Sequence, residues 1–329
     1  MINDLILKDT KKQEWSEIRA RIKARIEENL GACPVALSPT KAKFEELERY
    51  VEYGLVHIRI KYHVFLDEWD YAIILLPENF NENTDKAKAV VTIHGTNHEV
   101  GKYGVMDPVG KPKRNYAIEL AKRGYVTISP DQFGFGEIMN TEEGKTRFGR
   151  FYEKYPEWSL TGRRVLGHMR CVDVLDSLDY VIHDGYGTIG NSLGGQAALY
   201  LAGMDERIRV SIPSTGISPH ATNAYRLVHT PHPIHPHEAQ MLERNGKSPW
   251  ELNEMLALCA PRAVLVLEPF NDKYNPYTSV VYECVQSAHK VYALLEHPEC
   301  LCFYIHGDSH DTVDSVRELA YDYIDRFMK

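Results

Sequence analysis

The chain has 329 residues, of which 43% are hydrophobic and 26% are charged, and its formal net charge at pH 7 is −8. This composition is typical of a globular protein and excludes a fibrous or disordered chain. The acidic balance, without a long run of Lys or Arg, disfavours nucleic acid as a partner, because phosphate binding depends on clustered cations. The longest apolar runs are far too short to cross a bilayer, and the first residues lack a signal pattern. We therefore expect a cytoplasmic protein with no membrane partner.

The first part of the chain predicts helices. Residues 14–30 place apolar side chains at spacings of three and four, which is one apolar stripe on a helix, and Gly31 ends it. Residues 41–50 show a second short helical pattern. We therefore expect residues 1–54 to form a helical extension packed on a catalytic domain of residues 55–329.

Eight short apolar or alternating runs predict strands. They are residues 55–61, 71–76, 89–93, 125–129, 187–189, 210–213, 263–267 and 301–305. From the third onward, helical patterns separate them, as parallel strands require. These helices are expected at residues 115–123, 167–180, 193–202, 278–295 and 313–328. The first two strands follow each other closely and should pair antiparallel, so the predicted fold is α/β with a mostly parallel eight-stranded sheet flanked by helices.

Two insertions, residues 138–166 and 217–258, interrupt this alternation. Each follows the carboxyl end of a strand, so we expect both to cap a pocket at that edge of the sheet, with Trp158, His232 and Trp250 binding substrate. The alternative is that these aromatic residues only anchor the loops to the core or to a partner subunit.

The second insertion is rich in histidine, but its prolines break the helix that could place two imidazoles on one face. The six cysteines are scattered and have no paired CxxC spacing, which favours free thiols. We therefore expect no metal site.

Residues 190–195 read Gly-Asn-Ser-Leu-Gly-Gly and lie between a predicted strand and a predicted helix. This is the G-x-S-x-G pattern of a nucleophile elbow, in which a strained turn lifts the serine hydroxyl above the strand ends. Residues two before and two after the serine approach closely in such a turn, and Gly190 and Gly194 satisfy this requirement. Ser192 is therefore the candidate nucleophile, whereas the alternative is a serine that merely caps a helix.

An acid and a histidine follow the serine in the order that such a site requires, and each follows the carboxyl end of a later strand. Asp272 is the favoured acid and His310 the favoured base. Glu268 and His306 are the alternatives. Glu268 directly follows a strand, where a local hydrogen bond would hold its side chain. His306 ends a strand, whereas the turn at residues 307–309 delivers His310 over the sheet.

An oxyanion hole needs two N–H donors. One comes from the residue after the nucleophile, Leu193, and the other from the loop after the third strand, where Thr96 is the best candidate. His94, at the end of that strand, is expected to be structural.

Four segments in register resemble the dienelactone-hydrolase and acetyl-xylan-esterase branch of the α/β-hydrolases. They are residues 89–95, 119–126, 131–137 and 189–196. Residues 260–262 and 14–31 are also similar to that branch, so the resemblance spans nearly the whole chain. It implies an eight-stranded α/β-hydrolase acting on esters, with Ser192, Asp272 and His310 at the triad positions. The dienelactone enzymes proper use cysteine, so Ser192 places the chain with the esterases.

The sequence thus predicts a serine hydrolase that cleaves a small carboxylic ester, such as an acetylated carbohydrate, through an acyl-enzyme and without a cofactor. The same triad could instead cleave an amide, lactone or carbon–carbon bond, or transfer an acyl group. A binding protein that keeps the fold is a third alternative. Association into a homo-oligomer stays open.

Overall fold

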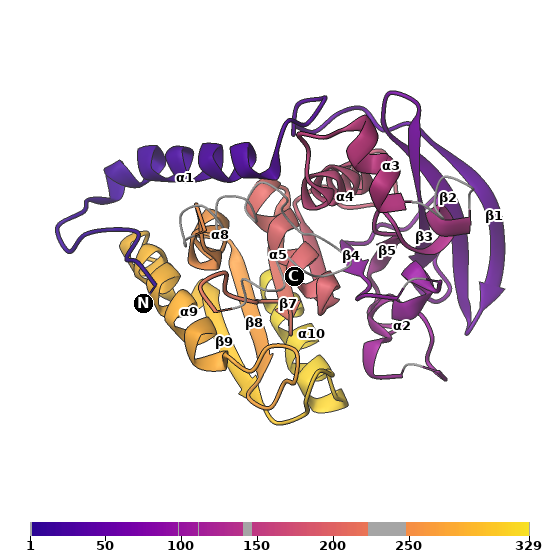
Figure 1. The fold of residues 1–329 in the computed structure, drawn as a ribbon. Coiled ribbons are helices and arrows are strands. Elements are labelled where there is room, and N and C mark those ends of the chain that lie inside the picture. The colour runs from indigo at the N-terminus through magenta and orange to yellow at the C-terminus, as the bar shows by residue number, and fades with distance from the viewer. Residues whose placement is uncertain (1, 98, 111, 141–146, 223–247, 329) are drawn as a thin grey trace.

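The protein is described by a computed structural model that covers residues 2–97, 99–110, 112–140, 147–222 and 248–328. One nine-stranded sheet runs through it in the order β1-β2-β3-β5-β4-β6-β7-β8-β9 (Figure 1). The strands are β1 (Phe44–Glu52), β2 (Leu55–Phe65), β3 (Glu68–Leu76), β4 (Ala89–Ile93), β5 (Val126–Pro130), β6 (Tyr186–Asn191), β7 (Ile208–Ser214), β8 (Ala263–Pro269) and β9 (Leu301–His306). The eight predicted strands correspond to β2–β9.

The direction of the strands divides the sheet into two parts. β4 to β9 are parallel to their neighbours within this group, whereas β1, β2 and β3 are joined antiparallel at one side, with β3 antiparallel to β5. The predicted antiparallel pairing of the first two expected strands is confirmed by β2 and β3. All carboxyl ends of β4, β6, β8 and β9 therefore lie at one edge of the sheet, where a site can form.

Helices cover both faces of the sheet. The main ones are α1 (Trp15–Leu30), α2 (Tyr116–Lys122), α3 (Arg147–Lys154), α4 (Leu160–Asp176), α5 (Leu193–Met204), α8 (Leu252–Cys259), α9 (Thr278–Leu294) and α10 (Asp314–Met328). Buried residues of α1, α4, α5, α8 and α9 share one core with one face of the sheet, while α2 and α10 share a second core with the other face. Along the described segments, no helix combines the length and the apolar character that crossing a membrane requires.

The segment after Lys43 is a strand, so the prediction of a helix over residues 41–50 is wrong. β1 pairs with β2 along its whole length, and its charged side chains make cross-strand pairs, including Glu48 with Arg59 at 3.2 Å and Glu45 with Lys61 at 2.9 Å. Glu and Lys are good helix formers, but here cross-strand pairing outweighs that local preference. The sheet therefore begins at Phe44, within the segment expected to be a helical extension.

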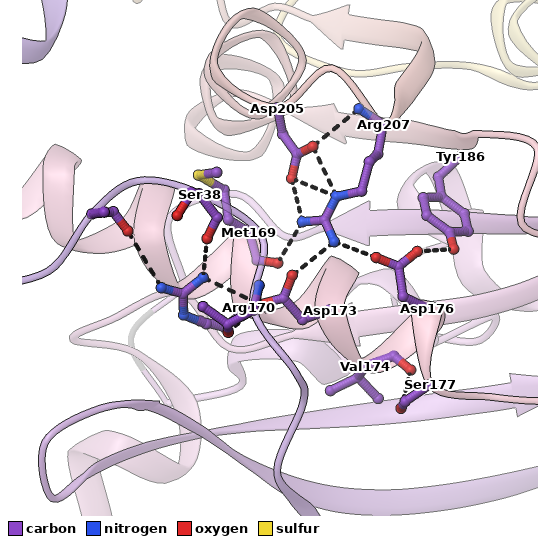
Figure 2. Close-up of polar contacts among 12 residues, drawn as sticks. Ser38, Met169, Arg170, Asp173, Val174, Asp176, Ser177, Tyr186, Asp205 and Arg207 are labelled. Atoms are coloured by element: carbon purple, nitrogen blue, oxygen red, sulfur yellow. Dashed lines mark hydrogen bonds and ion pairs between the residues drawn. The ribbon is translucent and has the colours of Figure 1, made fainter.

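A buried charge network centred on α4 holds the N-terminal segment around Ser38 against the helices that cover the sheet, as Figure 2 shows. Arg170 donates from Nη1 to the Ser38 carbonyl oxygen at 2.7 Å and to Asp173 at 3.1 Å. Asp173 also accepts from Arg207 at 2.7 Å, and Arg207 pairs with Asp205 at 2.6 Å. Arg170 and Asp173 are both buried. Breaking such a network would leave unpaired buried charge, so it holds the extension in one position.

The first insertion is shorter than predicted. α4 starts at Leu160, before the expected start at Gly167, because Ser159 acts as its N-cap and accepts the Gly162 N–H at 2.9 Å. In the second insertion, residues 223–247 lie outside the described residues, and α8 follows them as a helix that the sequence reading did not resolve.

Candidate active site

Ser192 lies between the end of β6 and the start of α5 with φ 60° and ψ −123°. A positive φ is rare for a residue other than glycine and indicates a conformation that the surroundings must enforce. The Ser192 N–H is held by the Ser214 carbonyl oxygen at 2.9 Å and by the Thr215 hydroxyl at 3.0 Å, both at the end of the neighbouring strand β7. The serine is thus presented at the carboxyl edge of the sheet, as a nucleophile elbow requires.

The two glycines of the motif are required by close backbone contacts. A Cβ added to Gly190 would lie 2.3 Å from the Gly194 carbonyl oxygen, and one added to Gly194 would lie 2.1 Å from the Ile93 carbonyl oxygen. Neither position has room for a methyl group. The turn around Ser192 therefore depends on both glycines.

Asp272 and His310 form a pair at the same edge. The Asp272 Oδ2 atom lies 2.6 Å from His310 Nδ1, and the Asp272 side chain is fully buried. The Tyr274 N–H donates to the other carboxylate oxygen at 2.7 Å, and the Tyr274 ring packs against the imidazole with a centroid distance of 4.7 Å. Because the carboxylate accepts at Nδ1, the proton sits there, and Nε2 is left to act as a base.

The two alternatives are held in other contacts. Glu268 is fully buried, and its Oε1 atom accepts the Ile217 N–H at 3.0 Å. His306 is also buried, with Nδ1 3.4 Å from the Asp308 carboxylate, and burial lowers its pKa. The geometry thus favours Asp272 and His310 as the acid and base.

The loop after β4 lies beside the nucleophile and is fixed by His94. Its Nε2 accepts the Gln132 N–H at 3.0 Å, so Nδ1 carries the proton and donates to the Gly95 carbonyl oxygen at 2.7 Å. The Gln132 side chain in turn donates to the His94 carbonyl oxygen. A Cβ on Gly95 would lie 3.5 Å from the Ser192 Cβ. Of the two predicted oxyanion donors, Thr96 follows Gly95 in this loop and is exposed, and Leu193 directly follows Ser192 at the start of α5.

A buried ion cluster fixes the segment that continues from the loop after β4. Lys102, in the 3-10 turn Gly101–Val105, is fully buried, and its Nζ lies 2.6 Å from both Asp131 and Glu137. Asp131 also accepts the Lys102 N–H at 2.8 Å. Asp131 and Glu137 begin and end one of the segments that resemble the esterase branch, but no sequence signal pairs them with Lys102, which lies 29 residues before Asp131.

The predicted substrate-binding tryptophans do not line an open pocket within the described segments. Trp158 is 1% exposed and packs against Phe65 and Phe151, and Trp250 is 2% exposed and packs against Tyr200. Burying these large apolar rings in the core stabilises the fold. This burial agrees with the alternative that the two tryptophans anchor the insertions to the core. His232 lies outside the described residues.

A small pocket beside Leu193 was missed by the sequence reading. Its polar lining comes from α4, α5 and the segment after β5, namely Gln132, Thr161, Arg164, His168 and Gln196. His168 is 2% exposed, and burial lowers its pKa to about 3, so the ring is neutral at pH 7. The residues have no common motif, and part of α4 was assigned to an insertion, so only the fold brings them together.

The described residues contain one group whose side chains could share a metal ion, His297, Glu299 and Cys300. It precedes β9, at the opposite edge of the sheet from Ser192, and burial raises the pKa of Cys300 to about 11. A protonated thiol is a poor metal ligand, so the state of Cys300 disfavours metal binding by this group. All six cysteines are free, although Cys33 and Cys302 are only partly buried.

A protein-family model described as "Glucuronyl esterase, fungi" matches residues 79–296, which is more than half of the chain. The chain belongs to the glucuronyl esterase family. This membership confirms the predicted class, a carboxylic-ester hydrolase, and agrees with the resemblance to α/β-hydrolase esterases.

Solved structures of glucuronyl esterases and other esterases share the fold. A glucuronoyl esterase from Solibacter usitatus superposes with a TM-score of 0.75 at 18% identity, covering 99% of this chain and 97% of that one. A promiscuous CE15 esterase from a marine bacterial metagenome gives 0.74 at 17% identity, over 100% and 97%. A putative acetyl xylan esterase from Bacteroides fragilis gives 0.67 at 15% identity, over 92% and 77%. These likenesses confirm the predicted α/β-hydrolase fold.

A curated relative, the putative hydrolase YtaP of Bacillus subtilis (strain 168), is 29% identical over 202 residues. The match covers 57% of this chain and 60% of that relative, so it spans less than two thirds of the relative's length.

Proposed function

We propose that this glucuronyl esterase family member hydrolyses carbohydrate esters, with Ser192 as nucleophile, His310 as general base and Asp272 as the acid that orients it. The observation that carries the proposal is the Asp272–His310 hydrogen bond of 2.6 Å at the sheet edge where the strained turn presents Ser192. A nucleophile, a base and an orienting acid on three neighbouring loops are what acyl transfer to serine requires.

The reaction proceeds in two halves. His310 Nε2 takes the proton from Ser192 Oγ as the oxygen attacks the ester carbonyl carbon, and the Leu193 and Thr96 N–H groups stabilise the oxyanion. His310 then gives this proton to the alkoxide, which leaves as the alcohol. Water attacks the acyl-enzyme in the same way, with His310 as base, and releases the carboxylic acid and free Ser192. Asp272 stabilises the imidazolium in both halves.

The position of His310 divides the site into an alcohol side and an acyl side. The leaving alcohol must lie next to His310, which protonates it, and therefore near the loops that follow β8 and β9. The pocket beside Leu193 receives no lining residue from those loops. This pocket therefore borders the acyl side of the site, but its volume of about 10 Å³ has room for a water molecule rather than for a sugar.

The groups that line this pocket are mostly polar. Gln132, Thr161 and Gln196 offer hydrogen-bonding groups, neutral His168 offers one donor and one acceptor, and Arg164 adds a positive charge. The description of the matching family model supports a uronic acid as the acyl half, and the polar groups beside Leu193 are compatible with it.

A panel of esters tests this proposal. We expect the purified protein to hydrolyse the methyl ester of glucuronic acid with a higher kcat/KM than 4-nitrophenyl butyrate or a peracetylated xyloside, measured by titration of the released acid. Faster turnover of the acetylated sugar would show that the carbohydrate is the alcohol half of the preferred ester and not its acyl half. Absence of ester hydrolysis across the panel, with turnover of an amide or lactone instead, would contradict the proposed reaction.

A further inference from the structure

Arg114 lies between the histidine loop and the oxyanion loop, although no catalytic motif includes it. It ends the short 3-10 turn Pro112–Arg114, on the connection between β4 and α2 that also carries the oxyanion loop. Its Nη2 donates to the main-chain carbonyl oxygen of His310 at 3.1 Å and to the Asp311 carboxylate at 3.2 Å. The guanidinium group thus holds the backbone of the catalytic histidine.

The other end of the guanidinium group approaches Gly95 in the oxyanion loop. Arg114 Nη1 lies 3.9 Å from the point where a Gly95 Cβ would stand, and the Ser192 Cβ lies 3.5 Å from the same point. Gly95 leaves this space open, because it has no side chain. One planar group therefore binds the histidine loop on one side and lies near Gly95 of the oxyanion loop on the other.

The histidine loop needs such support because its backbone is strained. Ser309, directly before His310, has φ 58°, which is unusual for a residue other than glycine. Asn271 holds the loop upstream, through the Gly307 carbonyl oxygen at 2.8 Å and the Ser309 N–H at 3.0 Å. Asp272 fixes the imidazole. The hydrogen bonds of Asn271 and Asp272 do not involve the main-chain carbonyl oxygen of His310. Arg114 supplies that contact.

We propose that Arg114 is a positioning residue, which sets the distance between His310 and Ser192 by clamping the histidine loop to the oxyanion loop. The inference rests on the proposed ester hydrolysis. Arginine suits the role, because its rigid fork offers several donors in one plane, whereas the ammonium group of lysine is a single point on a flexible stem. Lys113 illustrates the difference. Its Nζ lies 3.6 Å from the Asp311 carboxylate, and its side chain is 52% exposed, so it pairs with the loop only at the surface.

Arg114→Ala, Arg114→Lys and the matched control Lys113→Ala test the proposal, with steady-state kinetics on an ester that the wild type hydrolyses. We expect Arg114→Ala to lower kcat by about 100-fold, because a displacement of the order of 1 Å in a catalytic group has such an effect. KM should stay within about threefold, since the residue positions the base rather than the substrate. Lys113→Ala should keep the kcat of the wild type within about twofold. Guanidinium ion, added at tens of millimolar to Arg114→Ala, should restore part of the lost kcat.

Three results would overturn the proposal. They are an Arg114→Ala enzyme as active as Lys113→Ala, a change confined to KM, or a loss of kcat that guanidinium ion does not restore at all. If Arg114→Ala fails to fold, Arg114→Lys decides, because it keeps the charge: a kcat equal to that of the wild type would contradict the positioning role, and a fall of about tenfold or more supports it. A wild type that hydrolyses no ester would instead refute the proposed function.

Discussion

Ser192→Ala is expected to lower kcat for ester hydrolysis by about four to six orders of magnitude, because the variant lacks the atom that attacks the carbonyl carbon. The fold should be unaffected, since the change removes one oxygen from a partly exposed side chain. Initial rates on the best ester of the panel, at enzyme concentrations high enough to detect slow turnover, measure the loss.

A second serine provides the control for this experiment. Ser211 lies in β7, is fully buried, and donates to the Ala198 carbonyl oxygen at 3.1 Å, away from the site edge. Ser211→Ala should keep kcat within about threefold, because a buried hydroxyl contributes to stability and not to the chemistry. If Ser192→Ala retained more than about a hundredth of the wild-type rate, the nucleophile would have to be another group.

Asp272→Asn should lower kcat by about three to four orders of magnitude, whereas Glu268→Gln should lower it by less than about tenfold. The asparagine amide can donate to His310 Nδ1 and so stabilise the wrong tautomer, with the proton on Nε2, which then cannot act as a base. Glu268 accepts the Ile217 N–H, whereas Asp272 accepts from the imidazole. Parallel kinetics of the two variants on one ester give the ranking.

The opposite ranking would transfer the acid role to Glu268. Equal, modest losses in the two variants would show that the carboxylates share the role, and would contradict the assignment to Asp272 alone.

The sheet was predictable because its strands carry strong local signals. The run at residues 89–93, for example, coincides with β4, since a strand buried on both faces reads as continuous apolar residues. β1 lacked such a signal. It is an edge strand with most of its side chains exposed, and its glutamates favour a helix locally, so only its pairing with β2 defines it.

The candidate triad could be predicted because its order along the chain and its position after strands follow from the topology. The Asp272–His310 pairing matches that prediction in geometry, and its catalytic role stays a proposal. Arg114 and His168 could not be found in this way. Each reaches the site through tertiary contacts from a turn or a helix without a motif. Trp158 and Trp250 were predicted to bind substrate, but they lie in the core. An aromatic residue in a capping segment has the same sequence signal whether it faces a pocket or the core.

The most direct test of the central claim is to label the protein with a fluorophosphonate and map the modified peptide by mass spectrometry. Such a reagent reacts with a serine whose hydroxyl is activated by a neighbouring base, and it reports on that serine independently of the substrate. We predict a single adduct on Ser192, absent from Ser192→Ala and formed much more slowly in Asp272→Asn. An adduct on another residue, or equal labelling of Ser192→Ala and the wild type, would contradict the account.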